Sequence, residues 1–557
     1  MKKIYVLMFA AGLMSLAASC AKEENAVENG VNEPAVTILA SLEDDGTKVT
    51  VNNTTGKVEW AAGDKIAVYA GSYVESDGLA AAGNPGSFTF ASLTDANRAN
   101  FAIYPASAAV AGSVTASDLK VQYPATYALT DLNSEAAAPV MIAANAPATN
   151  LAFKHVGALL RITVNDVPKG VDELRVIFDK DVTGEFSVTG ASTATPSVAV
   201  AAATSKNVVT FTFSALAAMQ NVVLSIPVPS GDLATVRVEA YAGGLPFPCG
   251  ITFAGATGLQ RTHAKKLTAY MPVFSVSATK KVVFSPGNLE AHTTDAGANW
   301  TWKFADEQYG LLASYATVDG KMHISTDEGA RMHFRWSTVE AADYGINAED
   351  TGTYYDYVGT TFQDWGTNPI TWGTYTYPSN TWRTPSSALC YTFSRTYAGI
   401  DASLNGTRGE LGYLFEERPA STVHGLVTHT GTDEEDMENA RFVKVRLNSD
   451  DATRGVILFP DHFTFPDGVS KLPAYLNRTD AWYRTEFTFA DWALLEAAGC
   501  VYIPRGDTFY YTSDYNVGDA NGWGVNMLNI MSTGNDIRIG WGRPYQNYQV
   551  RLVRDAN

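Results

Sequence analysis

Few residues of this chain stand in the patterns that covalent chemistry requires. The four cysteines (Cys20, Cys249, Cys390 and Cys500) form no CxxC pair, so neither a zinc knuckle nor a redox motif is present. Cys390 and Cys500 either pair or, in the interpretation we favour, are buried free thiols. No Ser-His-Asp context, phosphate loop or pair of acid/base carboxylates stands out. We therefore expect no enzyme, no catalytic residue and no cofactor.

Two further clusters bear on metal binding. His424 and His429 lie in a loop rich in Gly and Thr, with no ligand motif around them. The acidic residues 433–436 and Glu438 could attract calcium, which takes several oxygen ligands, but they lack the spacing and the glycine of a calcium loop. A solvated acidic loop is the favoured interpretation, and we expect no metal site.

Aromatic side chains beside polar groups are the remaining candidates, because a sugar ring or a peptide stacks on exposed Trp and Tyr. Ten of the eleven tryptophans lie beyond residue 272. The segments densest in such residues are 510–515, 521–523 and 541–545. The alternative is that these aromatic side chains fill the core of a domain that has few helices.

The composition limits the class of partner. Lys plus Arg number 40 and Asp plus Glu number 58, which gives a net charge of −18. Binding to nucleic acid needs a concentrated basic surface, so we expect no nucleic-acid partner. With 46% hydrophobic and 18% charged residues, the chain has the composition of globular domains with cores of their own. So few cysteines indicate domains held by packing rather than by disulfides.

The first 20 residues have the pattern of a secretory signal peptide: a basic start, an apolar run at 4–18 and small residues before the break. The apolar run is shorter than the roughly 20 residues of a membrane-spanning helix. The sequence LAASC at 16–20 resembles a bacterial lipoprotein box. That resemblance implies that Cys20 carries a lipid and anchors the mature protein to the outer membrane. The alternative is an ordinary signal peptide with an incidental cysteine.

Residues 21–34 are acidic and poor in apolar side chains, so we expect a flexible tether. The sequence CAKEE at 20–24 resembles the charged signals of surface-exposed lipoproteins of the Bacteroidota. The resemblance implies export to the outer face of the outer membrane. The alternative is a merely acidic linker.

Short alternating strands with turn residues between them fill residues 35–272, a pattern typical of antiparallel sandwiches. We expect two β-sandwiches, 35–148 and 149–272, divided at an Ala-rich stretch. Three segments, at 56–69 (GKVEWAAGDKIAVY), 101–105 (FAIYP) and 153–162 (FKHVGALLRI), resemble fimbrillin-like proteins of the Bacteroidota. The resemblance implies transthyretin-like sandwiches in a pilus subunit, tip or anchor. In polymerising members a protease removes the first strand, here after Lys48 or Lys57, and a strand from a neighbouring pilin replaces it.

Residues 273–557 predict an α+β domain. One helix is expected at 388–397, after Thr384 and Pro385, and another at 492–498, after a capping box that begins at Thr488. Several motifs resemble, in this order, the major-paralogue domains related to the C-type-lectin-like fold; they lie at 283–289, 382–385, 455–461, 492–504 and 550–553. Neither the calcium-binding motif of such lectins nor the cysteine pair of the formylglycine-generating enzymes is present.

In lectin-like folds the long loops before the last strand often carry the ligand. By that resemblance the candidate ligand-binding residues are Trp523, Asp514, Trp541 and Arg543. The fold expected is mainly β, with two sandwiches followed by a lectin-like head. The implied function is a lipid-anchored surface adhesin, a pilus tip or accessory subunit, whose head binds glycan or a host or bacterial surface protein, with other pilins as further partners. The alternative is a surface glycan-binding lipoprotein of a polysaccharide-uptake system.

Overall fold

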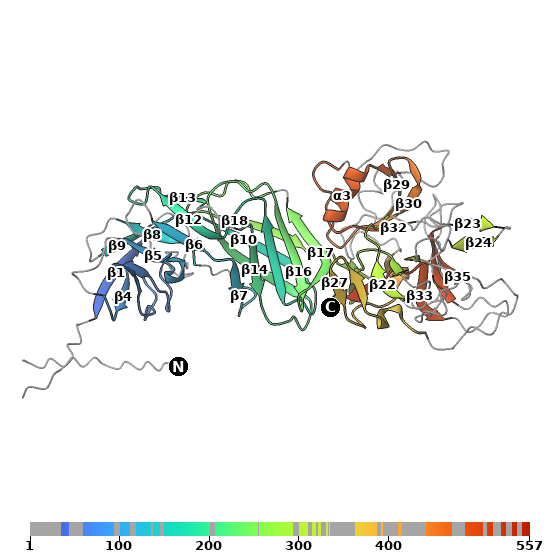
Figure 1. Ribbon diagram of the computed structural model, residues 1–557, viewed down its shortest axis with the longest axis horizontal. Helices are drawn as coiled ribbons and strands as arrows, with labels where there is room; N and C mark the ends of the chain where they lie inside the picture. Colours follow the sequence, from blue (N-terminus) through green and yellow to red (C-terminus); the bar gives the residue numbers. More distant parts are fainter. Residues whose placement is uncertain are drawn as a thin grey trace, which may run out of the picture.

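The structure is a computed structural model, and it confirms the mainly β class (Figure 1). It describes residues 35–43, 59–93, 101–111, 119–134, 138–144, 150–200, 206–253, 255–292, 300–309, 315–318, 321–324, 330–331, 334, 362–386, 391–393, 410–414, 442–469, 485–504, 510–515, 525–530, 537–542 and 549–557. Among these residues no helix has the length and the apolar character to cross a membrane.

Seven strands form the N-terminal sheet, in the order β3 (Tyr73–Glu75), β2 (Ala67–Tyr69), β5 (Phe101–Tyr104), β8 (Met141–Ala144), β9 (Asn150–His155), β1 (Val36–Leu42), β4 (Gly86–Phe90). The first four residues of β9 pair with β1, and its last two pair with β8. A strand that changes partners in this way lets one sheet fold over a core. We call this folded seven-stranded sheet the first sandwich.

Trp60 lies at the centre of that core and is fully buried. Its ring packs edge-on against Phe88, Tyr104 and Phe153, with centroids 4.9–5.3 Å away. Its indole N–H donates to the carbonyl oxygen of Ala40 in β1 at 2.8 Å, which satisfies the buried donor. Trp60 is therefore a core aromatic residue.

The second half is a sandwich of two sheets around one core. The larger has the order β17 (Leu245–Phe253), β16 (Val236–Ala242), β11 (Glu173–Phe178), β14 (Val208–Thr212), β7 (Thr126–Ala128); the smaller has the order β15 (Gln220–Val228), β10 (Ala158–Val167), β18 (Ala264–Tyr270). β11 alternates half-buried and buried residues along its whole length, the pattern of a strand with one face in a core.

The two halves interleave around residue 148. β9 follows that residue but pairs with β1 and β8, whereas β7 precedes it and pairs with β14. A third sheet, β13 (Ser197–Val200), β12 (Gly184–Thr189), β6 (Lys120–Tyr123), shares a core with β5 and β8 through Ile103 and Phe186. The domain division at 148/149 therefore stays a prediction, and a common core joins the two halves.

We call residues 273–557 the head, and its described residues form five sheets. They are β19 (Phe274–Ser275), β20 (Lys281–Phe284), β36 (Val553–Asp555); β25 (Ala330–Arg331), β21 (Leu289–His292), β22 (Thr301–Phe304), β26 (Ile370–Trp372), β27 (Tyr375–Tyr377); β23 (Tyr315–Val318), β24 (Lys321–Ile324); β28 (Tyr391–Phe393), β35 (Ile537–Gly542), β34 (Val525–Ile530), β33 (Tyr510–Tyr515); and β31 (Thr485–Phe487), β29 (Phe442–Leu447), β30 (Asp450–Leu458), β32 (Val501–Pro504).

One of the two expected helices is confirmed. α3 (Phe489–Ala497) begins with the capping box of Thr488 and Asp491, whose side chains each accept the other's backbone N–H. The helix expected at 388–397 is wrong for residues 391–393, which form β28 and pair with β35. The β-favouring Tyr-Thr-Phe sequence and its distant partner strand outweigh the local capping signal there. A short helix, α1 (Glu410–Leu414), was not expected.

The head is fastened to the second sandwich by a shared core and by polar contacts. Val283 and Ala556 of the head pack into the sandwich core. Lys281 bridges Asp166 of the sandwich, at 3.0 Å, and buried Asp461 of the head, at 3.3 Å. In Figure 1 the first sandwich, the second sandwich and the head follow one another along the long axis, and the C-terminus returns to the junction of the last two.

Candidate ligand-binding site

The sheet that carries two of the predicted ligand-binding residues lies at the end of the head away from the sandwiches (Figure 1). In this sheet Trp541 of β35 pairs with Asn526 of β34. On the next strand, Tyr511 pairs with Met527 and Tyr515 with Val525, so the residues between them, Asp514 included, bulge opposite Asn526. The backbone thus brings Asp514 and Trp541 to the same level of three neighbouring strands.

Asp514 is half-buried, and its backbone N–H lies 3.5 Å from the Thr512 hydroxyl. Three preceding residues of β33 (Tyr510, Tyr511 and Thr512) are buried. For the two tyrosines the core interpretation therefore holds, and they are not ligand-stacking surfaces. Bulges in strands commonly re-aim a side chain at a functional edge. Asp514 stays a candidate, half-exposed at such a bulge.

The other predicted residues stay predictions. Trp523, Arg543 and Cys20 lie outside the described residues, and for Trp541 the structure describes the backbone only. Cys249 and Cys500 are buried free thiols, whereas Cys390 lies outside the described residues. Within the described ranges no three His, Cys, Asp or Glu side chains gather to hold a metal ion.

The segment 362–386 supports β33 from one side. Trp365, fully buried, stacks on Tyr511 with centroids 5.9 Å apart, and the Ser513 N–H donates to the Pro385 carbonyl oxygen at 3.1 Å. Asp364 holds this segment in shape, because its carboxylate accepts the backbone N–H groups of Gly366 and Thr384. The bulge at Asp514 is therefore built on a fixed surface.

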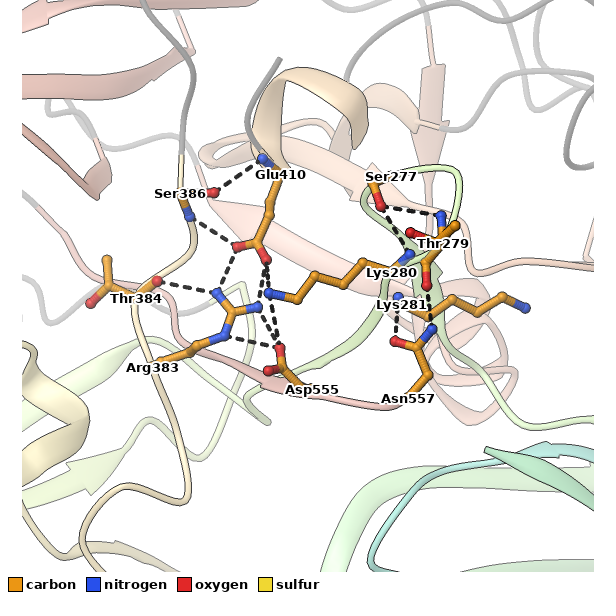
Figure 2. Close-up of polar contacts among 10 residues, drawn as sticks. All are labelled: Ser277, Thr279, Lys280, Lys281, Arg383, Thr384, Ser386, Glu410, Asp555 and Asn557. Atoms are coloured by element: carbon orange, nitrogen blue, oxygen red, sulfur yellow. Dashed lines mark hydrogen bonds and ion pairs between the residues drawn. The ribbon is translucent and has the colours of Figure 1, made fainter. Parts of the chain in front are cut away.

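Four charged residues connect that segment to α1 and to residues near the first and last positions of the head in the sequence (Figure 2). The guanidinium of Arg383 forms two hydrogen bonds with the Glu410 carboxylate, at 2.6 and 2.5 Å, and also contacts Asp555 at 2.5 Å. The ammonium of Lys280 lies 2.7 Å from Glu410 and 3.4 Å from Asp555. We call Lys280, Arg383, Glu410 and Asp555 the four-charge cluster.

The cluster shifts the pKa values of its buried members. Burial by itself would raise the pKa of Glu410, but the hydrogen bonds and charge of Arg383, together with Lys280 and the Ser386 N–H, hold it below its ordinary value. Burial by itself would lower the pKa of Arg383, and its bonds to Glu410 and Asp555 raise it instead. Glu410 and Arg383 therefore both stay charged near neutral pH, with Glu410 as the buried centre of the cluster.

Sequence reasoning missed the cluster, although one signal was present. Arg383 lies in the Trp-Arg-Thr-Pro motif that carried part of the family resemblance, but nothing local to the motif names Glu410 or Asp555 as its partners. The antiparallel bridge between Arg383 and Val553 brings the motif beside the last strand. This long-range pairing brings Arg383 beside Asp555, and the contact of α1 with Ser386 brings Glu410 beside both.

Comparison with known proteins gives no family assignment. No family model matches the chain, and no curated protein matches it. Among solved structures, it is similar to a candidate cell adhesion protein from Bacteroides ovatus, at 14% identity and a TM-score of 0.27, over 43% of this chain and 93% of that one.

Two further solved structures have comparable similarity. A candidate cell adhesion protein from Bacteroides uniformis has 13% identity and a TM-score of 0.24, over 42% of this chain and 93% of that one. A fimbrial protein from Bacteroides ovatus has 10% identity and a TM-score of 0.20, over 94% of this chain and 99% of that one. Likenesses with TM-scores this low do not establish a shared fold or function.

Proposed function

We propose that this chain is a cell-surface adhesin, a pilus tip or accessory subunit held at the outer membrane by a lipid on Cys20. Its head binds a glycan or a protein on a host or bacterial surface, with Asp514, Trp523, Trp541 and Arg543 at the contact. The observation that carries the proposal is the linear order of the parts in Figure 1. The sheet with Asp514 and Trp541 lies at the end opposite the first sandwich.

Continuous packing supports a role in holding the head away from the membrane. Ile103 and Phe186 join the N-terminal sheet to the β13–β12–β6 sheet, and Val283 and Ala556 extend the core of the second sandwich into the head. The second sandwich and the head therefore form one rod, because an interface packed like a domain interior does not swing freely. A rod with its candidate residues at one end suits recognition at a distance from an anchor.

The position of β1 supports the pilus component of the proposal. β1 lies between β4 and β9, and it buries Ile38, Ala40 and Leu42. Cleavage after Lys48 or Lys57, both outside the described residues, would free β1 and leave the backbone groups of two strands unpaired. An extended strand from another pilin would satisfy them through the same backbone hydrogen bonds.

Adhesion of whole cells tests the proposed function. Cells that display the full chain are compared with cells that display Asp514→Ala, Trp541→Ala or the double variant with both substitutions. Attachment is measured on surfaces coated with mucin or matrix protein. The expected result is reduced attachment at equal surface level. Phe489→Ala is the control, because Phe489 is an exposed aromatic residue on α3, away from that sheet. Attachment that survives the double variant contradicts the proposed site.

Mass spectrometry of the mature N-terminus tests the anchor. A lipid on Cys20 supports an anchored adhesin, whereas a new N-terminus after Lys48 or Lys57 supports assembly into a pilus. An unmodified Cys20 in membrane fractions, with the chain otherwise intact, contradicts the proposed lipid anchor.

A further inference from the structure

A cavity of about 630 Å³ opens between the second sandwich and the head. One wall comes from β16 and β17, and the other comes from the β26–β27 hairpin, α3 and the residues that follow α3. The volume lies within the roughly 300–1,000 Å³ of small-molecule sites, which often form where two domains meet. Asp514, the predicted ligand-binding residue whose side chain the structure describes, does not line this cavity.

Two aromatic residues at the tip of a hairpin line the cavity together. Trp372 ends β26 and Tyr375 begins β27, and the two are paired across the turn. Residues directly opposite in an antiparallel pair project from the same face, so both side chains lie on one side of the hairpin. Gly373, at a φ of +54°, permits the two-residue turn. Both aromatic side chains are half-buried, which leaves ring surface for a ligand.

The sandwich wall supplies an oriented carboxylate. Glu239 of β16 accepts the Tyr241 hydroxyl at 2.8 Å on one oxygen and the Arg237 guanidinium at 2.9 Å on the other. The ring of Tyr241 is itself held by the guanidinium of Arg175, 3.8 Å from the ring centroid. Each carboxylate oxygen has lone pairs for a further donor, so Glu239 can accept from a ligand without losing its partners.

The cavity wall formed by the head supplies a second carboxylate, on a face of α3 that otherwise carries alanine residues. Ala493, Glu496 and Ala497 line the cavity from one face of α3, while Trp492 and Leu495 point into the core. The small alanine side chains leave space for a ligand between the walls.

Gln308 fixes the position of Glu496. Its side-chain N–H donates to Glu496 at 2.9 Å, and its oxygen accepts from the Tyr502 N–H at 3.0 Å and from buried Arg551 at 2.7 Å. An amide that is bonded at both its nitrogen and its oxygen is held in one orientation. Glu496 is therefore presented to the cavity by a rigid support.

We propose that this cavity binds a neutral saccharide, with a sugar ring on Trp372 and Tyr375 and its hydroxyls donating to Glu239 and Glu496. Sugar rings offer a C–H face to an aromatic ring and a rim of donors to carboxylates, and these walls present both.

The charge of the walls selects against anionic ligands. Three carboxylates line the cavity: Glu239, Asp306 and Glu496. Among the described residues that line the cavity, Arg237 is the one cation, so one positive and three negative charges give the lining a net charge of −2. A sulfated or phosphorylated ligand would meet like charge, whereas a neutral polyhydroxy ligand would not.

Calorimetry on the chain from residue 21 to 557 tests the proposal, with maltohexaose, cellohexaose, xylohexaose and mannohexaose as neutral probes and a heparin-derived hexasaccharide as the anionic one. At least one neutral probe is expected to bind. Trp372→Ala and Glu239→Gln are each expected to weaken its binding roughly tenfold, which is about 1.4 kcal/mol. Ala493→Trp fills the space between the walls without removing a contact of the core, and it is expected to abolish binding.

Phe489→Ala is the matched control, since it removes an aromatic ring from α3 that does not line the cavity. Thermal unfolding confirms that each variant is folded. The proposal is overturned if no neutral probe binds, if the heparin fragment binds more tightly, or if Ala493→Trp leaves binding unchanged. Asp514→Ala and Trp541→Ala are expected to keep saccharide binding in the cavity. Loss of cell attachment in those variants therefore reports on the candidate site at Asp514 and Trp541 alone.

Discussion

From the four-charge cluster we predict that Glu410→Gln lowers the stability of the head near neutral pH. The Glu410 side chain is 8% exposed and accepts from Arg383, Lys280 and the Ser386 N–H. The amide of glutamine has no charge, and in either orientation it turns a donor toward one of these donors. The substitution therefore weakens the hydrogen bonds and leaves one donor facing another.

The expected loss is about 2 kcal/mol. Removal of one partner of a fully buried ion pair costs roughly 3–5 kcal/mol. Here Arg383 keeps Asp555, which is 47% exposed, and Lys280 is 40% exposed, so water screens part of the loss. A loss of about 2 kcal/mol corresponds to a decrease in Tm of roughly 4–8 °C for a part of this size.

The effect depends on pH in a defined direction. The pKa of Glu410 is lowered in the folded state, so its stabilisation is fully present above the unfolded pKa near 4.5 and is lost as pH falls through the folded pKa. The wild-type chain should therefore lose its advantage over Glu410→Gln in acid. The assay is differential scanning calorimetry at neutral pH and at successively lower pH. Asp467→Asn, at an exposed head residue, is the control. Equal melting at neutral pH, or a difference that persists unchanged in acid, would refute the reasoning.

Three more predictions concern the supports of the fold. Trp60→Phe removes the N–H bond to Ala40 and leaves a void, so chemical denaturation should show a loss of about 2–3 kcal/mol in the first sandwich. Lys281→Met leaves buried Asp461 with fewer donors and Asp166 without this cation; limited proteolysis should then cut at the sandwich–head junction, and unchanged protection would contradict the bridge. In Gly366→Ala the new methyl group would collide with the Trp382 carbonyl, so a decrease in Tm of several degrees is expected, whereas Gly83→Ala, whose methyl group finds its nearest neighbour at 3.8 Å, should change it little.

Local signals in the sequence predicted local structure well. The Thr488 capping box needs only residues three apart, and the helix that it predicts is present. Trp60 sits in a segment of alternating polarity, which is sufficient to place it in a core. At residues 391–393 the same kind of local signal misled, because β35 offers pairing partners that no window around Thr384 contains. Propensity determines structure only where no distant strand competes for the backbone.

The candidate sites show the same limit. Aromatic density alone pointed to residues 510–515, but Tyr510 and Tyr511 are core residues because Trp365 and the final strands cover them. The cavity residues Glu239 and Trp372 come from segments that are far apart in the sequence, and neither lies in a motif. Their proximity follows from docking of the β26–β27 hairpin on β17, which depends on the whole fold. Composition could therefore indicate aromatic recognition but not its location.

The location of the cavity connects ligand binding to the joint between the second sandwich and the head. Its walls belong to both parts, so a ligand that contacts Glu239 and Glu496 at once binds only while the two are docked. Binding to the docked form stabilises it by RT ln(1 + [L]/Kd), about 2.7 kcal/mol when the ligand is present at 100 times its Kd. The shared core at Val283 and Ala556 and the Lys281 bridge already hold the joint in the free chain. A ligand in the cavity should thus stiffen the joint between the second sandwich and the head. A pulling force on a head that is bound to a surface would otherwise separate the two parts at this joint.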